Sequence, residues 1–522
     1  MREWDARRLA AQAGARLIAG AEPTGERERR GGSGRGSAPG PLGVSIDSRA
    51  LAAGELFVGL AGEHVDGGRY AAQALRAGAW GVLVAPGHAS AALAAARERE
   101  LEATGADRTP AASAAPEGMA AVLVHEDPLR ALQSLAGAWR RELRARGARL
   151  VAITGSTGKT STKDILAALL SGAGLRVAAS PENHNTEIGL PLALLSAPGE
   201  TQALVLEMAM RGPGQIAELT AIAEPDVGVI VNVGPAHLER LGSLEAVAAA
   251  KAELIAGLAT GATVVVPADE PLLAGHLRAE LRTITFGEGG EVRLAGRGQD
   301  GRVAIDHAGR LIELRPSFAQ AHQLRNLLAA VAAARALGIT PRGRLQVRFT
   351  AMRGQRERLP GGIELIDDCY NANPMSMRAA IDELTASAAG RSVAVLGDML
   401  ELGTLAPRLH REIGAHARAA GVQLLVTVGP LAARMASSFA GETRAAGDAR
   451  EAGELLDGLL REGDTVLVKG SRGLGLERVV ERLRAAGAAQ ANTHASGERR
   501  GTEARAAFAR PAAGASPGPG RR

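Results

Sequence analysis

The chain has 522 residues, too many for a single hydrophobic core, and this length predicts about three domains. Aromatic residues make up only 2% of the sequence, so the cores are expected to consist of alanine, valine, leucine and isoleucine. The formal net charge is +5, but residues 487–522 alone contribute +4, with six arginines and two glutamates. No basic face interleaved with aromatic residues remains, which argues against a nucleic-acid-binding protein.

The single cysteine, Cys369, excludes an intramolecular disulfide and fits a reducing compartment. Residues 1–20 have the pattern of an amphipathic helix with charges throughout, without the apolar stretch of a signal peptide. No segment reaches about 18 uninterrupted apolar residues. These features predict a soluble, cytoplasmic protein that does not insert into membranes.

Three stretches have the composition of unfolded segments. Residues 21–41 and 88–118 are expected to be disordered surface insertions, and residues 488–522 a disordered tail. Between the two insertions, residues 42–85 predict short strands and one helix, and another strand and helix are expected before residue 147. Together these elements predict a small α/β domain over residues 1–147.

Residues 148–340 and 341–487 each contain apolar runs without alternation, separated by helical stretches. Such runs are typical of strands that are buried on both faces of a parallel sheet. The pattern predicts α/β architecture with three domains: the small N-terminal domain, a central parallel-sheet domain and a C-terminal Rossmann-like domain. The predicted strands of the two larger domains span residues 150–154, 203–207, 227–233 and 263–267, then 363–367, 392–397, 424–429 and 465–469.

A glycine-rich loop and then a helical pattern follow the run at residues 150–154. A loop at this position presents backbone N–H groups to an anion, so we expect it to bind a nucleotide phosphate. The amine of Lys159 would reach the β- and γ-phosphates, and the hydroxyl of Thr160 would bind Mg²⁺. The spacing differs from the standard phosphate loop, which needs a glycine at Ile153, and a purely structural turn is the alternative. The predicted loop residues are Gly155, Ser156, Thr157, Gly158, Lys159, Thr160 and Ser161.

Two polar side chains, Glu207 and His237, follow strands that are expected to flank the phosphate loop. Ligands bind at the carboxyl ends of strands in open α/β sheets, so we expect both side chains to bind a metal ion. For either residue alone, a polar side chain that merely ends a strand is the alternative interpretation.

Lysine is rare in this sequence, because only four of the 61 basic residues are lysines and the others are arginines. The amine of lysine is a compact point charge, whereas the guanidinium group is a planar fork that stays charged. Positions that keep lysine are therefore expected to need the amine. They are Lys159, Lys163, Lys251 and Lys469.

Three segments resemble the Mur ligase family: TGSTGKTS at residues 154–161, VNVGPAH at 231–237 and DDCYNANP at 367–374. The resemblance implies an ATP-dependent amide ligase. A substrate carboxylate attacks the γ-phosphate of ATP, and an amine then displaces phosphate from the acyl phosphate. The third segment favours the branch that adds D-alanyl-D-alanine to UDP-N-acetylmuramoyl-tripeptide, the last cytoplasmic step towards the peptidoglycan pentapeptide precursor.

The resemblance also implies a metal centre. Lys251 lies in the segment AAKAEL, which matches the place where the family carries a lysine carbamylated by CO₂. As a carbamate it would bind Mg²⁺ together with Thr160, Glu207 and His237, and two Mg²⁺ sites are expected. The same resemblance makes Lys159, Lys251, His237 and Glu207 the expected catalytic residues.

Further positions match residues of the family that bind substrates. Asn326 matches the residue that contacts adenine, and Arg356 and Asp368 match residues that contact the nucleotide after domain closure. Ser48 and Arg49 are expected at the uridine-diphosphate site. The residues expected to face the dipeptide or the cleft beside it are Asn371, Asn373 and Lys469.

Two alternatives stay open from the sequence. One is a sister ligase that adds another amino acid, such as the tripeptide-forming Mur ligase or folylpolyglutamate synthase, and the other is a non-catalytic nucleotide-binding regulator on the same fold. Pro267 occupies the position of a family asparagine near the nucleotide, so the contacts to the base are expected to differ. We expect the protein to be a monomer.

Overall fold

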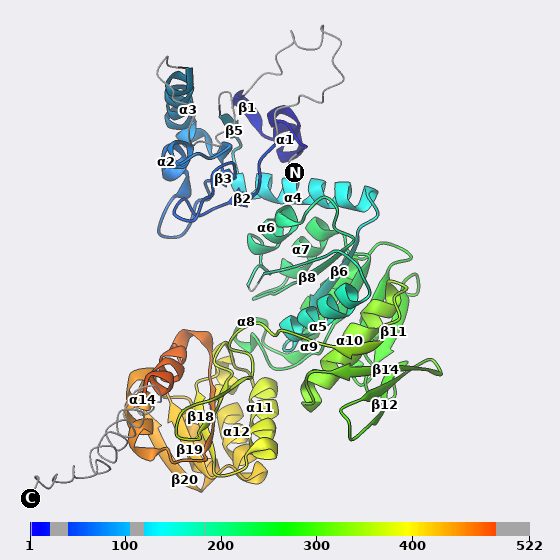
Figure 1. Cartoon of the computed structure of the whole chain (residues 1–522), viewed down its shortest axis with the longest axis vertical. Coiled ribbons are helices and arrows are strands. Elements are labelled where there is room, and N and C mark those ends of the chain that lie inside the picture. Colours follow the sequence, from blue (N-terminus) through cyan, green and yellow to red (C-terminus); the bar gives the residue numbers. More distant parts are fainter. Residues whose placement is uncertain (2, 21–39, 105–119, 182, 487–522) are drawn as a thin grey trace, which may run out of the picture. The chain divides into compact units, whose positions relative to one another are not determined.

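The computed structural model of the chain describes residues 1, 3–20, 40–104, 120–181 and 183–486. They form two compact units, Met1–Thr350 and a second unit that begins at Ala351 (Figure 1). Most of the predicted insertion at residues 21–41 and the whole predicted tail lie outside the described residues.

The first unit begins with a five-stranded sheet in the order β1-β5-β4-β3-β2. Only β1 runs antiparallel to its neighbour, and the other four strands are parallel. The strands are β1 (Arg16–Ala19), β2 (Val44–Ser45), β3 (Leu56–Val58), β4 (Gly81–Val84) and β5 (Ala121–Val124). The helices are α1 (Ala6–Ala13), α2 (Ala71–Arg76), α3 (Ala89–Thr104) and α4 (Pro128–Ala145).

The helix predicted over residues 1–20 is too long. Gly14 ends α1 in the left-handed conformation, with φ of 63°, and its N–H donates to the carbonyl of Ala10. A glycine adopts this conformation without steric cost, so it is a common helix terminator. The chain then enters strand β1, which the sequence analysis did not predict.

The insertion predicted over residues 88–118 is wrong for its first half, because residues 89–104 form α3. Ala92, Ala95 and Ala96 of this helix are buried in the core that covers the five-stranded sheet. Alanines at a spacing of three and four residues make an apolar stripe even when the rest of the helix is charged. The second half of the predicted insertion, residues 105–118, lies outside the described residues.

The second sheet of this unit has ten strands, in the order β15-β14-β13-β12-β11-β10-β9-β6-β8-β7. The four predicted strands are present as β6, β8, β9 and β10, while the antiparallel extension β12–β14 was not predicted. Strand β15 still belongs to this sheet, so the sheet extends beyond the predicted boundary near residue 340. The strands are β6 (Arg149–Thr154), β7 (Val177–Ala179), β8 (Ala203–Glu207), β9 (Val227–Ile230), β10 (Thr263–Pro267), β11 (Arg282–Phe286), β12 (Val292–Arg297), β13 (Val303–His307), β14 (Arg310–Pro316) and β15 (Gly343–Leu345).

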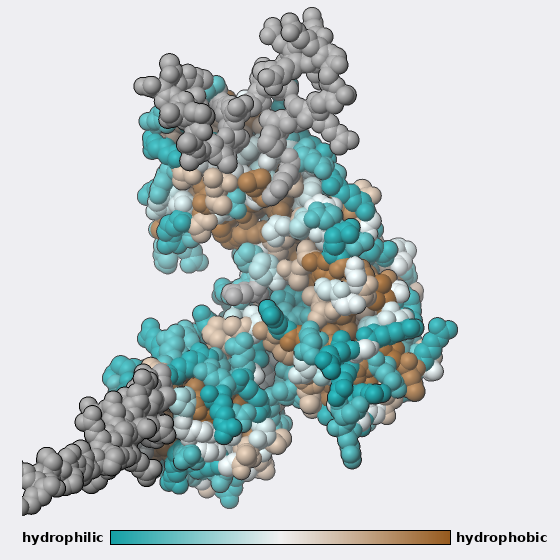
Figure 2. Space-filling model, viewed as in Figure 1, coloured by the Kyte–Doolittle hydropathy of each residue, from teal (hydrophilic) through white to brown (hydrophobic). Residues whose placement is uncertain are grey.

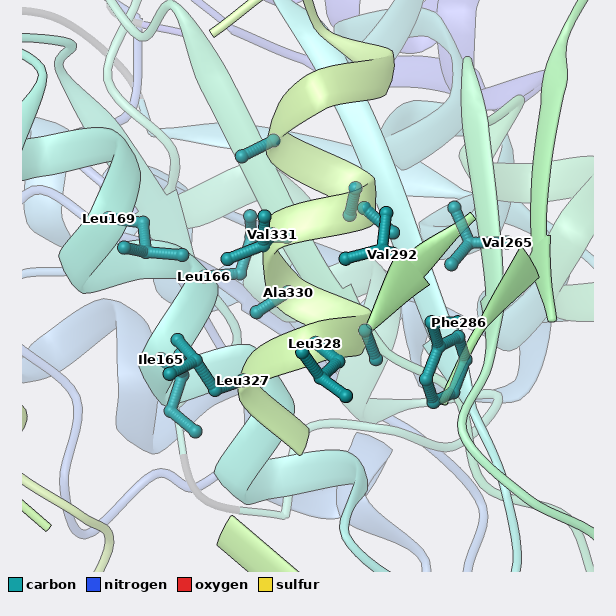
Figure 3. Packing of buried hydrophobic residues seen from close by; sticks show 14 of the residues in the cluster. Ile165, Leu166, Leu169, Val265, Phe286, Val292, Leu327, Leu328, Ala330 and Val331 are labelled. Atoms are coloured by element: carbon teal, nitrogen blue, oxygen red, sulfur yellow. The ribbon is translucent and has the colours of Figure 1, made fainter. Parts of the chain in front are cut away.

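Helix α10 (Ala321–Ala336) lies in the centre of the core beside this sheet. Six consecutive residues, 329–334, are five alanines and one valine, and none of them has exposed surface. Figure 3 shows α10 between the sheet and α5 (Lys159–Gly172), so small side chains let three layers approach closely. The labelled neighbours are Ile165, Leu166 and Leu169 on α5 and Val265, Phe286 and Val292 on the sheet side (Figure 3). The other helices are α6 (Gly189–Ser196), α7 (Gln215–Ala223), α8 (Leu238–Leu241) and α9 (Leu244–Gly257).

Helix α4 is fixed to the ten-stranded sheet by a buried arginine. Arg140 has no exposed surface, and its Nη2 lies 2.8 Å from Oδ2 of Asp226, just before β9. The same guanidinium donates to the carbonyls of Ala148, Ala223 and Glu224. The neighbouring Trp139 packs edge-to-face on Trp4, with ring centroids 5.5 Å apart.

The second unit contains a six-stranded sheet in the order β16-β17-β21-β18-β19-β20, in which only β16 is antiparallel. The four predicted strands are confirmed as β17, β18, β19 and β21. Hydrophilic residues dominate the face of this unit that Figure 2 shows. In the described part of the chain, no helix has the length and apolar character needed to cross a bilayer. The strands are β16 (Gln355–Arg358), β17 (Glu364–Asp367), β18 (Ser392–Gly397), β19 (Leu424–Val428), β20 (Glu442–Ala446) and β21 (Thr465–Lys469), and the helices are α11 (Pro374–Ser387), α12 (Ala406–Ala420), α13 (Ala433–Phe439) and α14 (Ala449–Leu459).

Candidate active site

The predicted phosphate loop connects the end of β6 with the first residue of α5. Gly158 adopts a positive φ of 78°, and a Cβ at this position would lie 2.6 Å from Oδ1 of Asn326. Only glycine allows this approach, so the loop glycine and Asn326 of α10 belong to one site. Nζ of Lys159 lies 3.0 Å from the carbonyl oxygen of Gly155, so the amine folds back over the loop.

Asn232, which the sequence analysis did not single out, holds the phosphate loop in shape. Its Oδ1 accepts hydrogen bonds from the N–H groups of Ser156 and Thr157, at 3.1 and 3.0 Å, and its Nδ2 donates to the carbonyl of Thr157. The hydroxyl of Ser156 also donates to the carbonyl of Gly234. The segment after β9 therefore fixes the phosphate loop through these hydrogen bonds. The asparagine directly after the apolar run was the feature of the sequence that could have predicted this contact.

Glu207 ends β8, and the sheet order confirms that β8 and β9 flank β6. Its carboxylate is buried, and Oε2 accepts a 2.6 Å hydrogen bond from the hydroxyl of Thr160. Oε1 accepts from Nδ2 of Asn185 at 2.9 Å, a residue that the sequence analysis did not single out. The backbone N–H of Glu207 donates to Oγ of Ser180. A carboxylate and a hydroxyl thus lie together beside the first turn of α5.

These two oxygen ligands fit a hard cation such as Mg²⁺, which prefers oxygen and binds few protein side chains. Among the described residues, however, no three His, Cys, Asp or Glu side chains gather at metal-binding distances. His237 lies in the loop after β9, caps α8 and has a positive φ of 57°. The rest of the predicted metal set would have to come from His237 and a modified Lys251.

Lys251 lies on α9 and is buried, with 1% of its surface exposed. Burial lowers the pKa of its amine well below the ordinary value, and the positive charge of Lys159 lowers it further. A neutral amine is the form that reacts with CO₂. Glu253 fixes the helix that carries this lysine, because its carboxylate accepts hydrogen bonds from the N–H groups of Gly214 and Ala217 at the start of α7.

Lys163, the other lysine of α5, makes contacts that stabilise the fold. It is buried, its Nζ donates to the carbonyl of Ser180 at 2.9 Å, and it lies 3.1 Å from a carboxylate oxygen of Asp164. The other oxygen of Asp164 accepts from the N–H and the hydroxyl of Thr350, the last residue of the first unit. Helix α5 therefore also holds the chain segment that leads to the second unit.

In the second unit, Lys469 at the end of β21 is almost fully buried and fully engaged. Its Nζ lies 2.6 Å from Oδ2 of Asp368 and 2.9 Å from the carbonyl oxygen of Asn371. Asn373 caps α11 by accepting from the N–H of Ser376. Lys469 and Asn373 thus fix the conformation of the loop at residues 367–374. Asn371, the third residue predicted to face the dipeptide, is exposed on this loop.

Two nearby arginines differ in what surrounds them. Arg356 is already neutralised, because its guanidinium lies 2.6 Å from Glu364 and 3.4 Å from Glu383. Arg353 stacks on the ring of Tyr370, 4.1 Å from its centroid, and its buried Nε has no hydrogen-bond partner among the described residues. Arg356, the predicted nucleotide contact, is therefore paired with carboxylates, whereas Arg353 packs against an aromatic ring.

The residues predicted to bind uridine diphosphate lie after β2 of the five-stranded sheet. Arg49 is mostly exposed and forms a 2.8 Å ion pair with Asp47, which lowers the pKa of that carboxyl to about 2. Ser48 lies between them and is half-buried. The structure therefore places both predicted residues in one polar turn on the surface of this sheet.

Comparisons with known proteins agree with this arrangement. Three family models match: "Mur ligase family, catalytic domain" at residues 42–140, "Mur ligase middle domain" at 153–334 and "Mur ligase, glutamate ligase domain" at 343–472. The UDP-N-acetylmuramoyl-tripeptide–D-alanyl-D-alanine ligase of Bacillus subtilis is 36% identical over 84% of this chain and 93% of that protein. The Escherichia coli ligase of the same name is 31% identical, with the same coverage.

Two solved structures resemble most of the chain. MurF from Acinetobacter baumannii superposes with a TM-score of 0.74 and 26% identity, covering 92% of this chain and 99% of that one. MurF from Thermotoga maritima, solved in complex with ADP, gives a TM-score of 0.68 and 28% identity, with coverage of 86% and 98%.

Proposed function

Since this chain belongs to the Mur ligase family, we propose that it is an ATP-dependent ligase that joins D-alanyl-D-alanine to UDP-N-acetylmuramoyl-tripeptide. The observation that carries the proposal is the match, over more than nine tenths of their length, to relatives with that activity in their names. The buried Thr160–Glu207 pair beside the phosphate loop supports it, because this hydroxyl and carboxylate would suit the Mg²⁺ that accompanies ATP.

The reaction has two steps. The terminal carboxylate of the tripeptide attacks the γ-phosphorus of ATP, which forms the acyl phosphate and releases ADP. The neutral amine of D-alanyl-D-alanine then attacks the acyl carbon, the C–O bond to phosphate breaks, and the amine loses a proton as the amide forms. Neither step needs a nucleophile from the protein, so charge neutralisation and alignment are the main requirements.

The first unit offers the groups that would neutralise charge. The first N–H groups of α5 have no partners within the helix, and Lys159 stands at its start, so both would bind the phosphates. Thr160 and Glu207 would hold Mg²⁺, with His237 contributing to a second site. Bound Mg²⁺ offsets the negative charge of the phosphates.

Lys251 would complete the metal centre as a carbamate. In that form the amine nitrogen would be bonded to the carbon of CO₂ and would have lost a proton, so an anion able to hold Mg²⁺ through oxygen would replace a neutral amine. The lowered pKa of this amine supports the step, since more of it is neutral at pH 7. Arginine could not form this group, which accounts for a lysine at this position in an arginine-rich chain.

The second unit would contribute contacts to both the nucleotide and the dipeptide. We assign the nucleotide contact to Arg353 rather than Arg356, because Arg356 is already paired with two carboxylates. Asp368 would face the nucleotide beside it, held by Lys469. The five-stranded sheet, with Ser48 and Arg49, would bind the uridine diphosphate. Because the proposed substrates are cytoplasmic precursors, the enzyme would act in the cytoplasm.

The test is phosphate release from ATP by the purified chain, with UDP-N-acetylmuramoyl-tripeptide present and D-alanyl-D-alanine added or omitted. Release that requires both substrates, together with a product mass equal to the pentapeptide, supports the proposal. Release with a single amino acid in place of the dipeptide would indicate a sister ligase. A chain that binds ADP but releases no phosphate from ATP under any of these conditions would be a regulator.

A further inference from the structure

The incoming dipeptide has three chemical features: an amine that reacts, a free carboxylate at its other end and two methyl side chains. A carboxylate is bound best by a guanidinium group, which offers several N–H donors in one plane. Lys469 cannot be this partner, because its amine is buried and already engaged by Asp368 and by the carbonyl of Asn371. Another cation at the same edge of the sheet would suit this carboxylate.

Arg472 has the required position and the required freedom. It follows β21 by three residues and so lies at the carboxyl end of the sheet, where ligands bind in this architecture. Its side chain is 55% exposed, and its one ion pair in the described part of the chain is long, with Nη1 3.9 Å from the carboxylate of Glu477, beyond hydrogen-bond distance. Its Nη1 donates to the thioether sulfur of Met352 at 3.4 Å, which is a weak acceptor.

The guanidinium is nevertheless held in place. It lies 5.9 Å from the ring centroid of Tyr370, within the range of a cation–π contact. Met352, which it also touches, has a positive φ of 59°, rare for a residue with a side chain. Such backbone strain is found mainly at functional sites, where the surrounding structure holds it. Arg353 stacks on the same tyrosine, so one ring orients two guanidinium groups.

An apolar side chain lies beside the turn that contains Arg472. Leu400 is 42% exposed, and its Cδ1 lies 3.3 Å from the position that a Cβ on Gly473 would take. Its backbone N–H donates to Oγ of Ser471 at 2.9 Å, which fixes the leucine next to this turn. A cation with unused donors beside an exposed aliphatic group matches a carboxylate beside a methyl group.

We propose that Arg472 binds the free carboxylate of D-alanyl-D-alanine and that Leu400 contacts the methyl group of its C-terminal residue. The inference rests on the proposed ligase function and adds the residue that selects a dipeptide with a free carboxyl end. Tyr370 then stands between the arginine for the dipeptide and Arg353, the arginine for the nucleotide, which suits two substrates that must react with each other.

The test compares D-alanyl-D-alanine with its C-terminal amide, which keeps the amine and the methyl groups but lacks the negative charge. In the Arg472→Gln enzyme, we expect the KM for the dipeptide to rise about 10- to 100-fold, the range of a lost charged hydrogen bond. The KM for the amide should stay unchanged, so the preference for the acid disappears. Arg472→Lys should restore part of that preference, because it restores the charge.

Arg478→Gln is the matched control, since Arg478 is exposed on the helix formed by residues 477–486 and has no ion pair among the described residues. It should keep the wild-type preference, and the KM for ATP and for the UDP-linked substrate should stay constant in both variants. An Arg472→Gln enzyme that still prefers the acid, or one whose KM rises equally for acid and amide, would overturn the inference. A wild-type chain that ligates neither compound would instead refute the proposed function.

Discussion

The buried ion pair between Arg140 and Asp226 gives a prediction with a defined magnitude. Replacing Arg140 with methionine keeps most of the apolar stem but removes the charge that Oδ2 of Asp226 faces at 2.8 Å. It also removes the donor for three backbone carbonyls in the same buried region. We therefore expect this single substitution to destabilise the attachment of α4 to the ten-stranded sheet.

Removing one partner of a buried pair costs about 3–5 kcal/mol. Asp226 does not lose every partner, because Arg149 and Arg144 stay at 3.3 and 3.8 Å, and the N–H of Leu150 still donates to it. Both arginines are at least half exposed, and such pairs contribute only about 0–1 kcal/mol each. We expect the lower end of the range, about 3 kcal/mol, or about 150-fold in the unfolding equilibrium constant.

The assay is urea unfolding followed by tryptophan fluorescence, which reports on the contact between Trp4 and Trp139 beside Arg140. If the free energy of unfolding falls by about 3 kcal/mol per molar urea, a loss of about 3 kcal/mol lowers the unfolding midpoint by about 1 M. Arg144→Met is the matched control: it lies one turn later on α4 and faces the same aspartate, but it is half exposed, so it should lower the midpoint by less than about 0.3 M.

Equal midpoint shifts in the two variants would refute the reasoning. That result would mean that burial of the guanidinium adds nothing to what an exposed charge contributes. A change in the slope rather than in the midpoint would point to partial unfolding, which chains with more than one unit often display.

Three further predictions concern the nucleotide site and the second unit. Asn232→Ala should weaken ADP binding about tenfold in calorimetry, because the phosphate loop loses the side chain that holds Ser156 and Thr157; tighter binding would mean that Asn232 competes with the phosphates. Lys251→Arg should lose most ligase activity while its ADP affinity survives, and near-wild-type activity would contradict the carbamate. His410 accepts a hydrogen bond from the N–H of Met399, and burial lowers its pKa. Its contribution to stability is therefore complete above the unfolded pKa, about 6.5, and is lost as the pH falls through the lower folded value. The urea concentration at the unfolding midpoint of the second unit should therefore fall as the pH is lowered from 7 to 5. His410→Gln should make this midpoint less dependent on pH.

The eight strands that were predicted in the two large sheets are apolar runs, which can be recognised without knowing their partner strands. The antiparallel extension was missed because β12 alternates poorly and exposes five of its six residues. Its pairing with β13 and β14 depends on turns and neighbours rather than on an apolar run. Helix α3 was missed for a related reason, since its buried stripe consists of alanines among charged residues.

The candidate site was predictable where one segment contains both the loop and its chemistry, as at Lys159 and Thr160. Asn232 and Asn185 were missed because each acts through a hydrogen bond to a residue distant in the chain. The ion pairs of Arg356 also could not be predicted from the sequence. Glu364 and Glu383 neutralise Arg356 from a neighbouring strand and a helix, and only the folded chain brings them together.

The alanines in the middle of α10 leave this part of the chain with few harmless amino-acid substitutions. A single base change turns an alanine codon into one for valine, threonine, serine, proline, glycine, aspartate or glutamate. At a site with no exposed surface, valine overfills the space, proline breaks the helix, glycine costs about 1 kcal/mol and a carboxylate has no partner. Because the same helix carries Asn326 to the phosphate loop and packs on α5, variation here should be rare even in residues that never touch a substrate.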